Sequence, residues 1–530
     1  MESLTGGQVA AATLAELGVR TIFSVSGNQI LPLYDAVIEA GIRIVHMRHE
    51  SAAAYAAAGA SEVSGLPGVV LVSAGPGHIA TLTGIAVAAS MELPLIYISG
   101  ASAVADRGRG AFQEIDQRQI ARSVCKDALD VTEVDGIRPA LARAWRLATS
   151  GVPGPVQVTL PVDMLNGKTN GMQRIQSQTN VETLSSSERS TLTRMAGALA
   201  EAERPLVIAR PSAARGASGV LLQQVCAALG IEPVVTECPR GLSDLKYADV
   251  VKRYRDSDCA LVIGPADFSV GFLEPEFLAT EGRILLIDAP DEPEPQRKPN
   301  LHARVAVELA LAHILERIPA SVATAQSWSE QWPIAGFKNG SSSPEPVGLH
   351  PLQVAMVVRE ELQAGDLVVL DGGEFCQWMR LGLRDAPCPV LWNGKLGAIG
   401  GAIPMAIGAR AAGHTGRLIV ALGDGSAGYH LSEFESATRY GLPFTAIVGN
   451  DARWAAEWHQ QVSRYGSDRT FETLLLPARY DQAAIGYGGA GVHVTDAVAL
   501  AYSLSASLPA TQPTLLNVPV LPMRSPAELL

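Results

Sequence analysis

The chain has 530 residues, of which 47% are hydrophobic and 18% are charged. This length exceeds that of one hydrophobic core, and the composition is that of a globular protein, so we expect about three domains and little disorder. The formal net charge of −12 and the scattered Lys and Arg residues argue against binding to nucleic acid or to an anionic membrane surface.

The N-terminal residues 1–19 have an amphipathic helical pattern without a basic start or an uninterrupted apolar stretch. The apolar stretch 79–99 is interrupted by Thr, Ser and Glu. We therefore expect neither secretion nor a membrane span, and a cytoplasmic location. The six cysteines form no CxxC pair, which is typical of a reducing compartment and predicts no zinc site.

Short runs rich in Val, Ile and Leu alternate with helical patterns along the whole chain. Such runs are typical of strands buried on both faces, and the helices between them predict parallel α/β sheets. In the first third of the chain the expected strands are residues 21–25, 43–47, 68–75, 94–100 and 155–162. In the rest of the chain they are residues 205–209, 259–264, 283–288, 366–373, 417–425, 444–451 and 514–520.

Two polar stretches, residues 167–188 and about 326–347, have the composition of linkers. They predict an α/β protein with three doubly wound parallel-sheet domains. These are an N-terminal domain (1–167), a central domain (188–325) and a C-terminal domain (346–530). The first and third segments are candidates for distant copies of one α/β plan.

The sharpest chemical signal is Gly-Asp-Gly-Ser at residues 423–426, directly after an expected strand. The next expected strand ends at Asn450 and Asp451, so oxygen ligands from both strands converge on one edge of the sheet, where open α/β sheets bind ligands. Glycines beside Asp424 let a diphosphate approach the backbone, and the following helix N-terminus favours its negative charge. Mg²⁺ prefers oxygen ligands of this kind. A turn is the alternative for Gly-Asp-Gly taken alone.

Further motifs occur in a fixed order along the chain. They are FSVSGNQILP (23–32), His49-Glu50, SAGPG (73–77), Phe112-Gln113-Glu114, Lys126 and GKLGAIGG (394–401). With the 423–451 segment, they resemble the thiamine-diphosphate- and magnesium-dependent enzymes of the acetolactate synthase and benzaldehyde lyase group. The resemblance is strong in the first and last domains and faint in the middle.

The resemblance implies catalytic roles for Glu50 and Gln113. In the family the helix glutamate hydrogen-bonds the aminopyrimidine of thiamine and promotes loss of the thiazolium C2 proton; a helix-capping role is the alternative for Glu50. Gln113 would line the reacting centre, which favours a carboligase over the pyruvate decarboxylases with their histidine pair.

The resemblance also implies how the cofactor is held. Cofactor contacts would come from Gly372, Glu374, Phe375, Gly397, Ile399, Gly423, Asp424, Gly425, Ser426 and Asp451. The Gly397 carbonyl would accept from the exocyclic amine, and Ile399 would lie beneath both rings; close helix packing is the alternative for this segment. Mg²⁺ would bind Asp424, Asp451 and the main-chain oxygen of Arg453. The family has Asn where Asp451 stands, which puts the cofactor affinity in question, and Asn450 is the alternative ligand.

The substrate pocket would include Ser26, Gly27, Asn28, His78, Phe112, Trp454, Glu457 and Trp458. Structural or surface roles are the alternatives for His78, for Glu457 and for the two tryptophans, which share a helical face at i and i+4. The central domain lacks the segment that helps to hold FAD in acetolactate synthase, so FAD is not expected.

The predicted function is a C–C bond lyase or carboligase that acts on small-molecule 2-oxo acids or 2-hydroxy ketones. The alternatives are a flavin-free 2-oxo acid decarboxylase, a benzaldehyde lyase-type enzyme and a non-catalytic cofactor-binding homologue. The resemblance implies a homodimer or homotetramer with active sites between subunits, Glu50 coming from one chain and the magnesium motif from the other.

Overall fold

The chain forms two compact units, Met1–Ser177 together with Val347–Leu530, and Gln178–Pro346. The computed structural model describes residues 3–169, 183–236, 253–254, 256–264, 282–295, 298–319, 348–508 and 511–526. The divisions between the units fall inside the two predicted linkers, most of which lie outside the described residues, as does the stretch after residue 264 that bears on FAD. The finer domain boundaries stay predictions.

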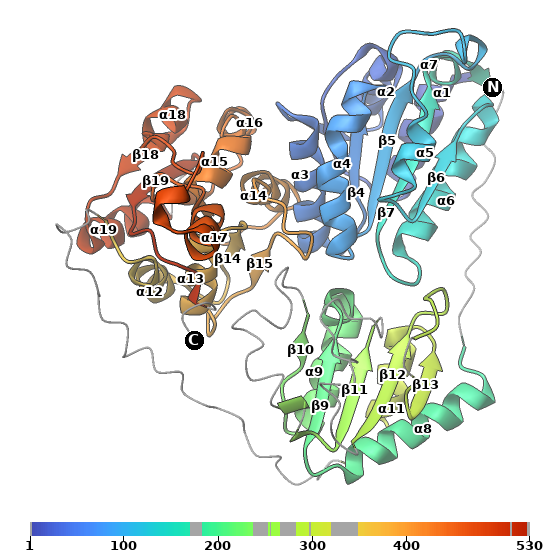
Figure 1. Cartoon of the computed structure of the whole chain (residues 1–530). Coiled ribbons are helices and arrows are strands. Elements are labelled where there is room, and N and C mark those ends of the chain that lie inside the picture. Colours follow the sequence, from blue (N-terminus) through green and yellow to red (C-terminus); the bar gives the residue numbers. More distant parts are fainter. Residues whose placement is uncertain are drawn as a thin grey trace. The chain divides into compact units, whose positions relative to one another are not determined.

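The N-terminal domain is built on a six-stranded parallel sheet in the order β3-β2-β4-β5-β7-β6 (Figure 1). Its strands are β2 (Thr21–Ser24), β3 (Arg43–His46), β4 (Gly68–Val72), β5 (Leu95–Ala101), β6 (Asp127–Asp130) and β7 (Pro155–Pro161). Its helices are α1 (Gly6–Glu16), α2 (Leu31–Glu39), α3 (Glu50–Ser64), α4 (Pro76–Ser90), α5 (Gln117–Ala121), α6 (Ile137–Thr149) and α7 (Val162–Asn166). A short antiparallel pair, β1 (Leu4–Thr5) and β8 (Lys168–Thr169), joins the two ends of the domain.

The C-terminal domain has a second six-stranded parallel sheet, in the order β15-β14-β16-β17-β19-β18. Its strands are β14 (Leu367–Leu370), β15 (Val390–Trp392), β16 (Leu418–Gly423), β17 (Thr445–Asn450), β18 (Ala490–His493) and β19 (Thr514–Pro519). Its helices are α12 (Pro351–Glu361), α13 (Glu374–Gly382), α14 (Ala402–Ala411), α15 (Asp424–His430), α16 (Glu433–Tyr440), α17 (Ala455–Tyr465), α18 (Tyr480–Gly486) and α19 (Ala497–Ser507). When each sheet's strands are counted in chain order, both sheets read 2-1-3-4-6-5, so the two domains share one plan.

The central domain carries a five-stranded parallel sheet in the order β10-β9-β11-β12-β13. Its strands are β9 (Pro205–Ala209), β10 (Val234–Val235), β11 (Cys259–Ile263), β12 (Arg283–Asp288) and β13 (Leu301–Arg304). Helices α8 (Ser186–Glu201), α9 (Gly216–Ala228) and α11 (Val307–Leu315) accompany them (Figure 1). The prediction of three parallel α/β sheets is confirmed.

Helices α3 and α14 join the first and last domains into one unit. Side chains from both domains form a single buried apolar cluster. A β-carbon at Gly408 would lie 1.8 Å from the Ala56 carbonyl oxygen, and one at Gly59 would lie 2.1 Å from that of Met405. The run of alanines in α3 therefore brings two backbones together at a distance that only small residues allow.

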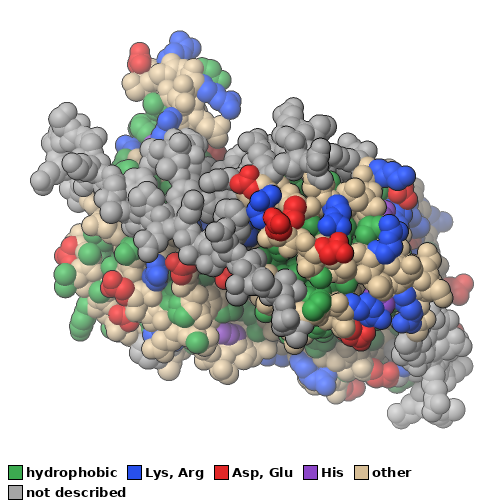
Figure 2. Space-filling model, turned by 90° about the horizontal axis from the view of Figure 1, so that it is seen from below, with side chains coloured by type: hydrophobic (Ala, Val, Ile, Leu, Met, Phe, Trp, Pro, Cys, Tyr) green, Lys and Arg blue, Asp and Glu red, His purple; other side chains and the backbone are tan. Residues whose placement is uncertain are grey.

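Acidic and basic side chains are interspersed on the face of the molecule shown in Figure 2. No helix among the described residues is long and apolar enough to cross a membrane. The cysteines within the described ranges are free thiols.

We predict that Gly408→Ala lowers the free energy of unfolding by about 1–3 kcal/mol, because the added methyl group forces the α3 and α14 backbones apart. Gly486→Ala, also in a helix of the C-terminal domain, is the control, since its β-carbon would meet no atom within 4 Å. Urea unfolding followed by circular dichroism measures both. Equal effects of the two substitutions would contradict this account of the packing.

Candidate active site at two sheet switch points

Both six-stranded sheets have a switch point, where successive connections leave in opposite directions. It lies between β2 and β4 in the N-terminal domain and between β14 and β16 in the C-terminal domain. Open α/β sheets bind ligands at the carboxyl ends of the strands at such points. The segments that follow these strands include residues 25–29, 73–77 and 424–426, which belong to three of the predicted motifs. They also include residues 371–375, which contain the predicted cofactor residues Gly372, Glu374 and Phe375.

Asp424 is the centre of the C-terminal switch point. It begins α15 directly after β16, and it is 2% exposed. Its Oδ1 accepts a hydrogen bond from Gly425 N at 2.9 Å, and its Oδ2 accepts one from Arg453 N at 3.2 Å. The second bond brings the segment after β17, with Asp451, to the carboxylate.

Asp424 and Asp451 form an electrostatically strained pair. Burial raises the pKa of Asp424 to about 6. Burial, and then the neighbouring charge of Asp424, raise the pKa of Asp451 to about 7. Two desolvated carboxylates that repel each other fit a divalent cation, which would offset both effects.

The surroundings of this pair also fit a diphosphate bound through Mg²⁺. A β-carbon at Gly423 would meet no atom within 4 Å, so the backbone there is open to a ligand. No group of three or more His, Cys, Asp and Glu side chains in the described part of the chain could hold a metal by itself. A hard cation at Asp424 and Asp451 would therefore take its other oxygens from main chain, phosphate or water.

Asn450, the alternative ligand, is occupied elsewhere. Its Nδ2 donates to the Ala478 carbonyl oxygen at 2.9 Å and to Asn517 Oδ1 at 3.2 Å, and its Oδ1 accepts from Ala452 N at 3.2 Å. These bonds tie the end of β17 to its surroundings. Asp451 is thus the better placed of the two predicted ligands.

The segment predicted to hold the pyrimidine is attached to the end of β14 by Asp371. This fully buried carboxylate accepts hydrogen bonds from Gly372 N (2.8 Å), Gly400 N (2.8 Å) and Ala402 N (2.9 Å), and burial raises its pKa. A β-carbon at Gly372 would lie 2.8 Å from Ile399 Cγ2, so the two predicted segments are in contact. The sequence placed Asp371 in a segment expected near the diphosphate, but the bonds by which it holds Gly400 and Ala402 were not predicted.

The remaining predicted cofactor residues surround this centre in different ways. Glu374 begins α13 and is buried, and Phe375 packs its ring against Gly449 of β17. Ser426 is buried within α15, whereas Gly397 is exposed with φ at +71°. Phe375 therefore stabilises the loops, and Gly397 presents open backbone.

Trp454 and Trp458 lie beside the magnesium motif. A β-carbon at Gly425 would lie 2.7 Å from the Trp454 ring, and the Arg453 guanidinium stacks 4.6 Å from the centre of the Trp458 ring. Glu457, on the same helix, is exposed. The tryptophans thus form a wall next to Asp424, and Glu457 faces solvent in this chain.

Glu50 is the first residue of α3, and it lies at the N-terminal switch point. Its Oε1 would be 3.5 Å from a β-carbon on Gly77, so the carboxylate faces the start of α4. It accepts no hydrogen bond from the residues that the structure describes, which leaves it available to a ligand. The N-terminus of α3 is fixed instead by Glu433, which accepts from Arg48 N at 3.0 Å and from His49 N at 3.2 Å.

Glu433 was not predicted to matter. It is fully buried in α16, and burial raises its pKa to about 7. It also accepts a hydrogen bond from Ser436 Oγ at 2.6 Å. An acidic residue in the helix after the Gly-Asp-Gly motif was the available signal, but its target lies almost four hundred positions earlier.

Gln113 is fixed by a chain of side chains from three motifs. Gln29 Nε2 donates to Gln113 Oε1 at 3.1 Å, and Ser73 Oγ donates to Gln29 Oε1 at 2.5 Å. Gln113 itself has φ at +62°, which is uncommon for a residue with a side chain. Gln29 lies inside the predicted 23–32 motif, whose residues 25–29 were expected to contact the substrate, and its bond to Gln113 links two of the predicted motifs.

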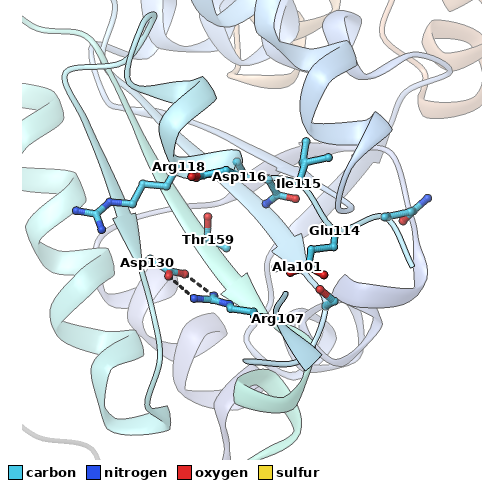
Figure 3. A pocket seen from close by; sticks show the side chains of 11 residues that line it. Ala101, Arg107, Glu114, Ile115, Asp116, Arg118, Asp130 and Thr159 are labelled. Carbon is cyan, nitrogen blue, oxygen red and sulfur yellow. Dashed lines mark hydrogen bonds and ion pairs between the residues drawn. The ribbon is translucent and has the colours of Figure 1, made fainter. Parts of the chain in front are cut away.

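A cavity of about 460 Å³ opens beside Gln113 at the carboxyl ends of β5, β6 and β7 (Figure 3). Arg107 and Asp130 lie side by side on its lining and form two bonds, of 2.6 and 2.8 Å. Glu114 accepts from Gly108 N at 2.6 Å and from Ala111 N at 3.1 Å, which holds the loop before Gln113. The cavity is polar, and these charged groups are paired within the protein.

The residues predicted to form the substrate pocket divide into two groups. Ser26, Asn28 and Phe112 are exposed, and a β-carbon at Gly27 would lie 2.4 Å from Ser73 Cβ, so this loop packs against the SAGPG motif. His78 has the structural surroundings that the sequence left open as its alternative role. It is fully buried, and its Nδ1 lies 2.7 Å from Tyr97 Oη and 3.1 Å from Ser99 Oγ, so it belongs to the domain interior rather than to a pocket wall.

Comparison with known proteins assigns both switch points to one family. Residues 4–120 match the N-terminal TPP-binding domain of thiamine pyrophosphate enzymes, and residues 371–518 match their C-terminal TPP-binding domain. The two ranges together make up half of the chain.

Several curated proteins are similar over almost the whole chain. A probable acetolactate synthase of Mycobacterium bovis is 26% identical over 98% of this chain and 96% of its own length. The 2-hydroxyacyl-CoA lyase 2 of Homo sapiens is 28% identical over 92% of this chain and 84% of its own length. The protein of the same name from Danio rerio is 28% identical over 92% of this chain and 86% of its own length.

We predict that Glu433 makes stability depend on pH. Its pKa in the folded chain, about 7, is above the ordinary value of 4.5, so its contribution is fully present below pH 4.5 and is lost as pH rises through 7. The total loss amounts to at most about 3 kcal/mol in the free energy of unfolding. Urea unfolding at pH 5 and pH 8 should show this loss in the wild type and a smaller one in Glu433→Gln.

Glu435→Gln on the same helix is the control, because Arg439 lowers the pKa of Glu435 instead of raising it. If the wild type and Glu433→Gln lose the same stability between the two pH values, Glu433 is not the source of the slope.

Proposed function

Because the chain belongs to the thiamine pyrophosphate-dependent enzymes, we propose that it cleaves or forms a carbon–carbon bond next to the carbonyl group of a 2-oxo acid or 2-hydroxy ketone. The observation that carries the proposal is the arrangement at the two switch points. Glu50 and Gln113 belong to one, and Asp424 and Asp451 belong to the other. Both lie within the ranges that match the family.

Thiamine diphosphate, when bound, supplies a nucleophilic carbon and an electron sink. Asp424, Asp451 and the main-chain oxygen of Arg453 would hold its diphosphate through Mg²⁺, and the backbone near Gly423 would approach the phosphates. Gly397 and Ile399 would hold the ring system from the 394–401 segment, which Asp371 fixes at Gly400 and Ala402. FAD has no place in the proposal.

Glu50 would control the proton on the aminopyrimidine. Its carboxylate stands at the start of α3, whose N-terminus is fixed by Glu433, and it has no competing hydrogen bond from the described residues. A rigid carboxylate without a partner suits proton transfer to and from a ligand.

Gln113 would orient the substrate. Its Oε1 is engaged by Gln29, so the two hydrogens on its Nε2 are directed to other acceptors, such as the carbonyl or hydroxyl oxygen of a substrate. The polar cavity beside it offers room for the rest of a small molecule (Figure 3). Ligation and cleavage are two directions of the same chemistry, and a panel of substrates decides between them.

We propose self-association as part of this function, with Glu50 acting on the cofactor of a second subunit. Large apolar side chains near the site are exposed in the single chain: Leu396 by 52%, Tyr429 by 57% and Phe112 by 74%. A second subunit would cover them. A cytoplasmic location remains our proposal from the sequence.

Glu50→Gln should lower turnover roughly 100-fold or more, because the amide cannot exchange the proton that the carboxylate controls. The measurement is consumption of pyruvate, benzoin and a 2-hydroxyacyl thioester, with product identification, with and without thiamine diphosphate and Mg²⁺. Glu39→Gln, exposed at the end of α2, is the control and should retain wild-type rates. Turnover that persists without cofactor would reject the proposal.

Asp451→Asn should tighten thiamine diphosphate binding about tenfold in the presence of Mg²⁺, because it removes a negative charge that repels both Asp424 and the diphosphate. Titration of the tryptophan fluorescence provides the Kd. Asp424→Asn is the matched comparison and should abolish binding. Weaker binding by Asp451→Asn would show that the carboxylate is an indispensable metal ligand.

A further inference from the structure

His430 is a buried histidine that the proposed chemistry does not use. It is the last residue of α15 and is 5% exposed. Its Nδ1 lies 2.6 Å from the Gly400 carbonyl oxygen, and its Nε2 lies 2.9 Å from Ser51 Oγ. It thus connects the segment predicted to hold the pyrimidine with the helix that begins at Glu50.

The hydrogen positions between Gly400, His430 and Ser51 follow from which atoms can donate and which can only accept. Burial lowers the pKa of His430 to about 4, so the ring is neutral near pH 7 and carries one N–H. The Gly400 carbonyl can only accept, so that hydrogen is on Nδ1. Nε2 then has a lone pair, and the Ser51 hydroxyl donates to it.

Gly400 is held on both sides by this arrangement. Its N–H donates to Asp371, and its carbonyl accepts from His430. A β-carbon there would lie 3.3 Å from His430 Nδ1 and 2.4 Å from Tyr429 Cβ, and φ is +89°, so the position accepts only glycine. The peptide has no freedom to turn away from the site.

The series of contacts that begins at Gly400 and His430 ends at Ser51 and His49, the two neighbours of Glu50 in sequence. His49 Nδ1 lies 3.1 Å from Ser51 N and 2.7 Å from Ser51 Oγ. Because the Ser51 hydroxyl donates to His430, the shorter contact takes its hydrogen from His49 Nδ1. His49 and Ser51 flank Glu50 in the first turn of α3. The direction in which the Glu50 carboxylate leaves the helix therefore depends on residues that are bonded to His430.

We propose that His430 is a positioning residue: with Ser51 it holds the Gly400 carbonyl against the cofactor bound by its own chain, and it fixes the helix turn from which Glu50 reaches the cofactor of a second subunit. The inference rests on the proposed function, because the ligand positioned is thiamine diphosphate. His430 touches neither ligand nor reacting atoms in this role.

Two replacements of His430 separate its two contacts. The side-chain amide of Asn reaches the place of Nδ1 and keeps the bond to Gly400, whereas that of Gln reaches the place of Nε2 and keeps only the bond to Ser51. We expect His430→Gln to weaken thiamine diphosphate binding about tenfold and His430→Asn to weaken it less than threefold. Fluorescence titration with thiamine diphosphate and Mg²⁺ on the full-length protein measures both.

Ser51→Ala tests the coupling between the two residues. Alone, Ser51→Ala should weaken thiamine diphosphate binding about fivefold to tenfold. Combined with His430→Gln, it should weaken binding by no more than a further twofold, because Ser51 and His430 act through the hydrogen bond that joins them. Ser61→Ala removes a buried hydroxyl from the same helix, bonded to the Pro94 carbonyl at 3.1 Å, and should leave the Kd unchanged.

The outcomes distinguish this inference from the function on which it rests. If the wild type binds no thiamine diphosphate, the proposed function falls and the inference falls with it. If the wild type binds and His430→Gln and Ser51→Ala change only the unfolding temperature, His430 is merely structural and the inference alone is overturned. Equal Kd values for His430→Asn and His430→Gln would also overturn it.

Discussion

The close contact between the backbones of α3 and α14 is the constraint on which the rest of the structure depends. Gly59 and Gly408 allow it, and the alanines of α3 fill the space around it. Through this contact the N-terminal and C-terminal sheets share a core. Every bond that joins the two switch points, including those of Glu433 and His430, requires the two helices to be this close.

The architecture and the main motifs were predictable from sequence because both are local. Buried parallel strands are short apolar runs, and each motif directly follows such a run, which places it at the carboxyl edge of a sheet. The repeated plan of the first and last domains was suspected and is visible in their identical strand orders. A ligand role could be predicted for Asp424 from its place at the end of a strand, whereas the role of Glu50 was implied only by the resemblance of the ordered motifs.

The residues that hold the motifs in place, such as Glu433 and His430, could not be predicted from the sequence, and the reason is physical. Glu433 holds residues 48 and 49, and His430 meets Ser51, across separations in sequence that only the packing of two domains brings together. Gln29 was expected to contact the substrate as part of its motif, but its bond to Gln113, 84 positions away, could not be predicted from either segment alone. For His78 the sequence left a structural role and a pocket role open, and its burial against Tyr97 favours the structural one.

The identical strand order of the N-terminal and C-terminal domains bears on how proton transfer and metal binding come to be placed in different domains. Two copies of one plan present two equivalent crevices, and nothing in the backbone distinguishes a place for proton transfer from a place for a metal. The distinction comes from a few side chains, a lone carboxylate at one crevice and a carboxylate pair at the other. A ligand with two chemically different ends is what such a duplicated scaffold is suited to bind when two copies associate, with one end in the first crevice of one subunit and the other end in the second crevice of its partner.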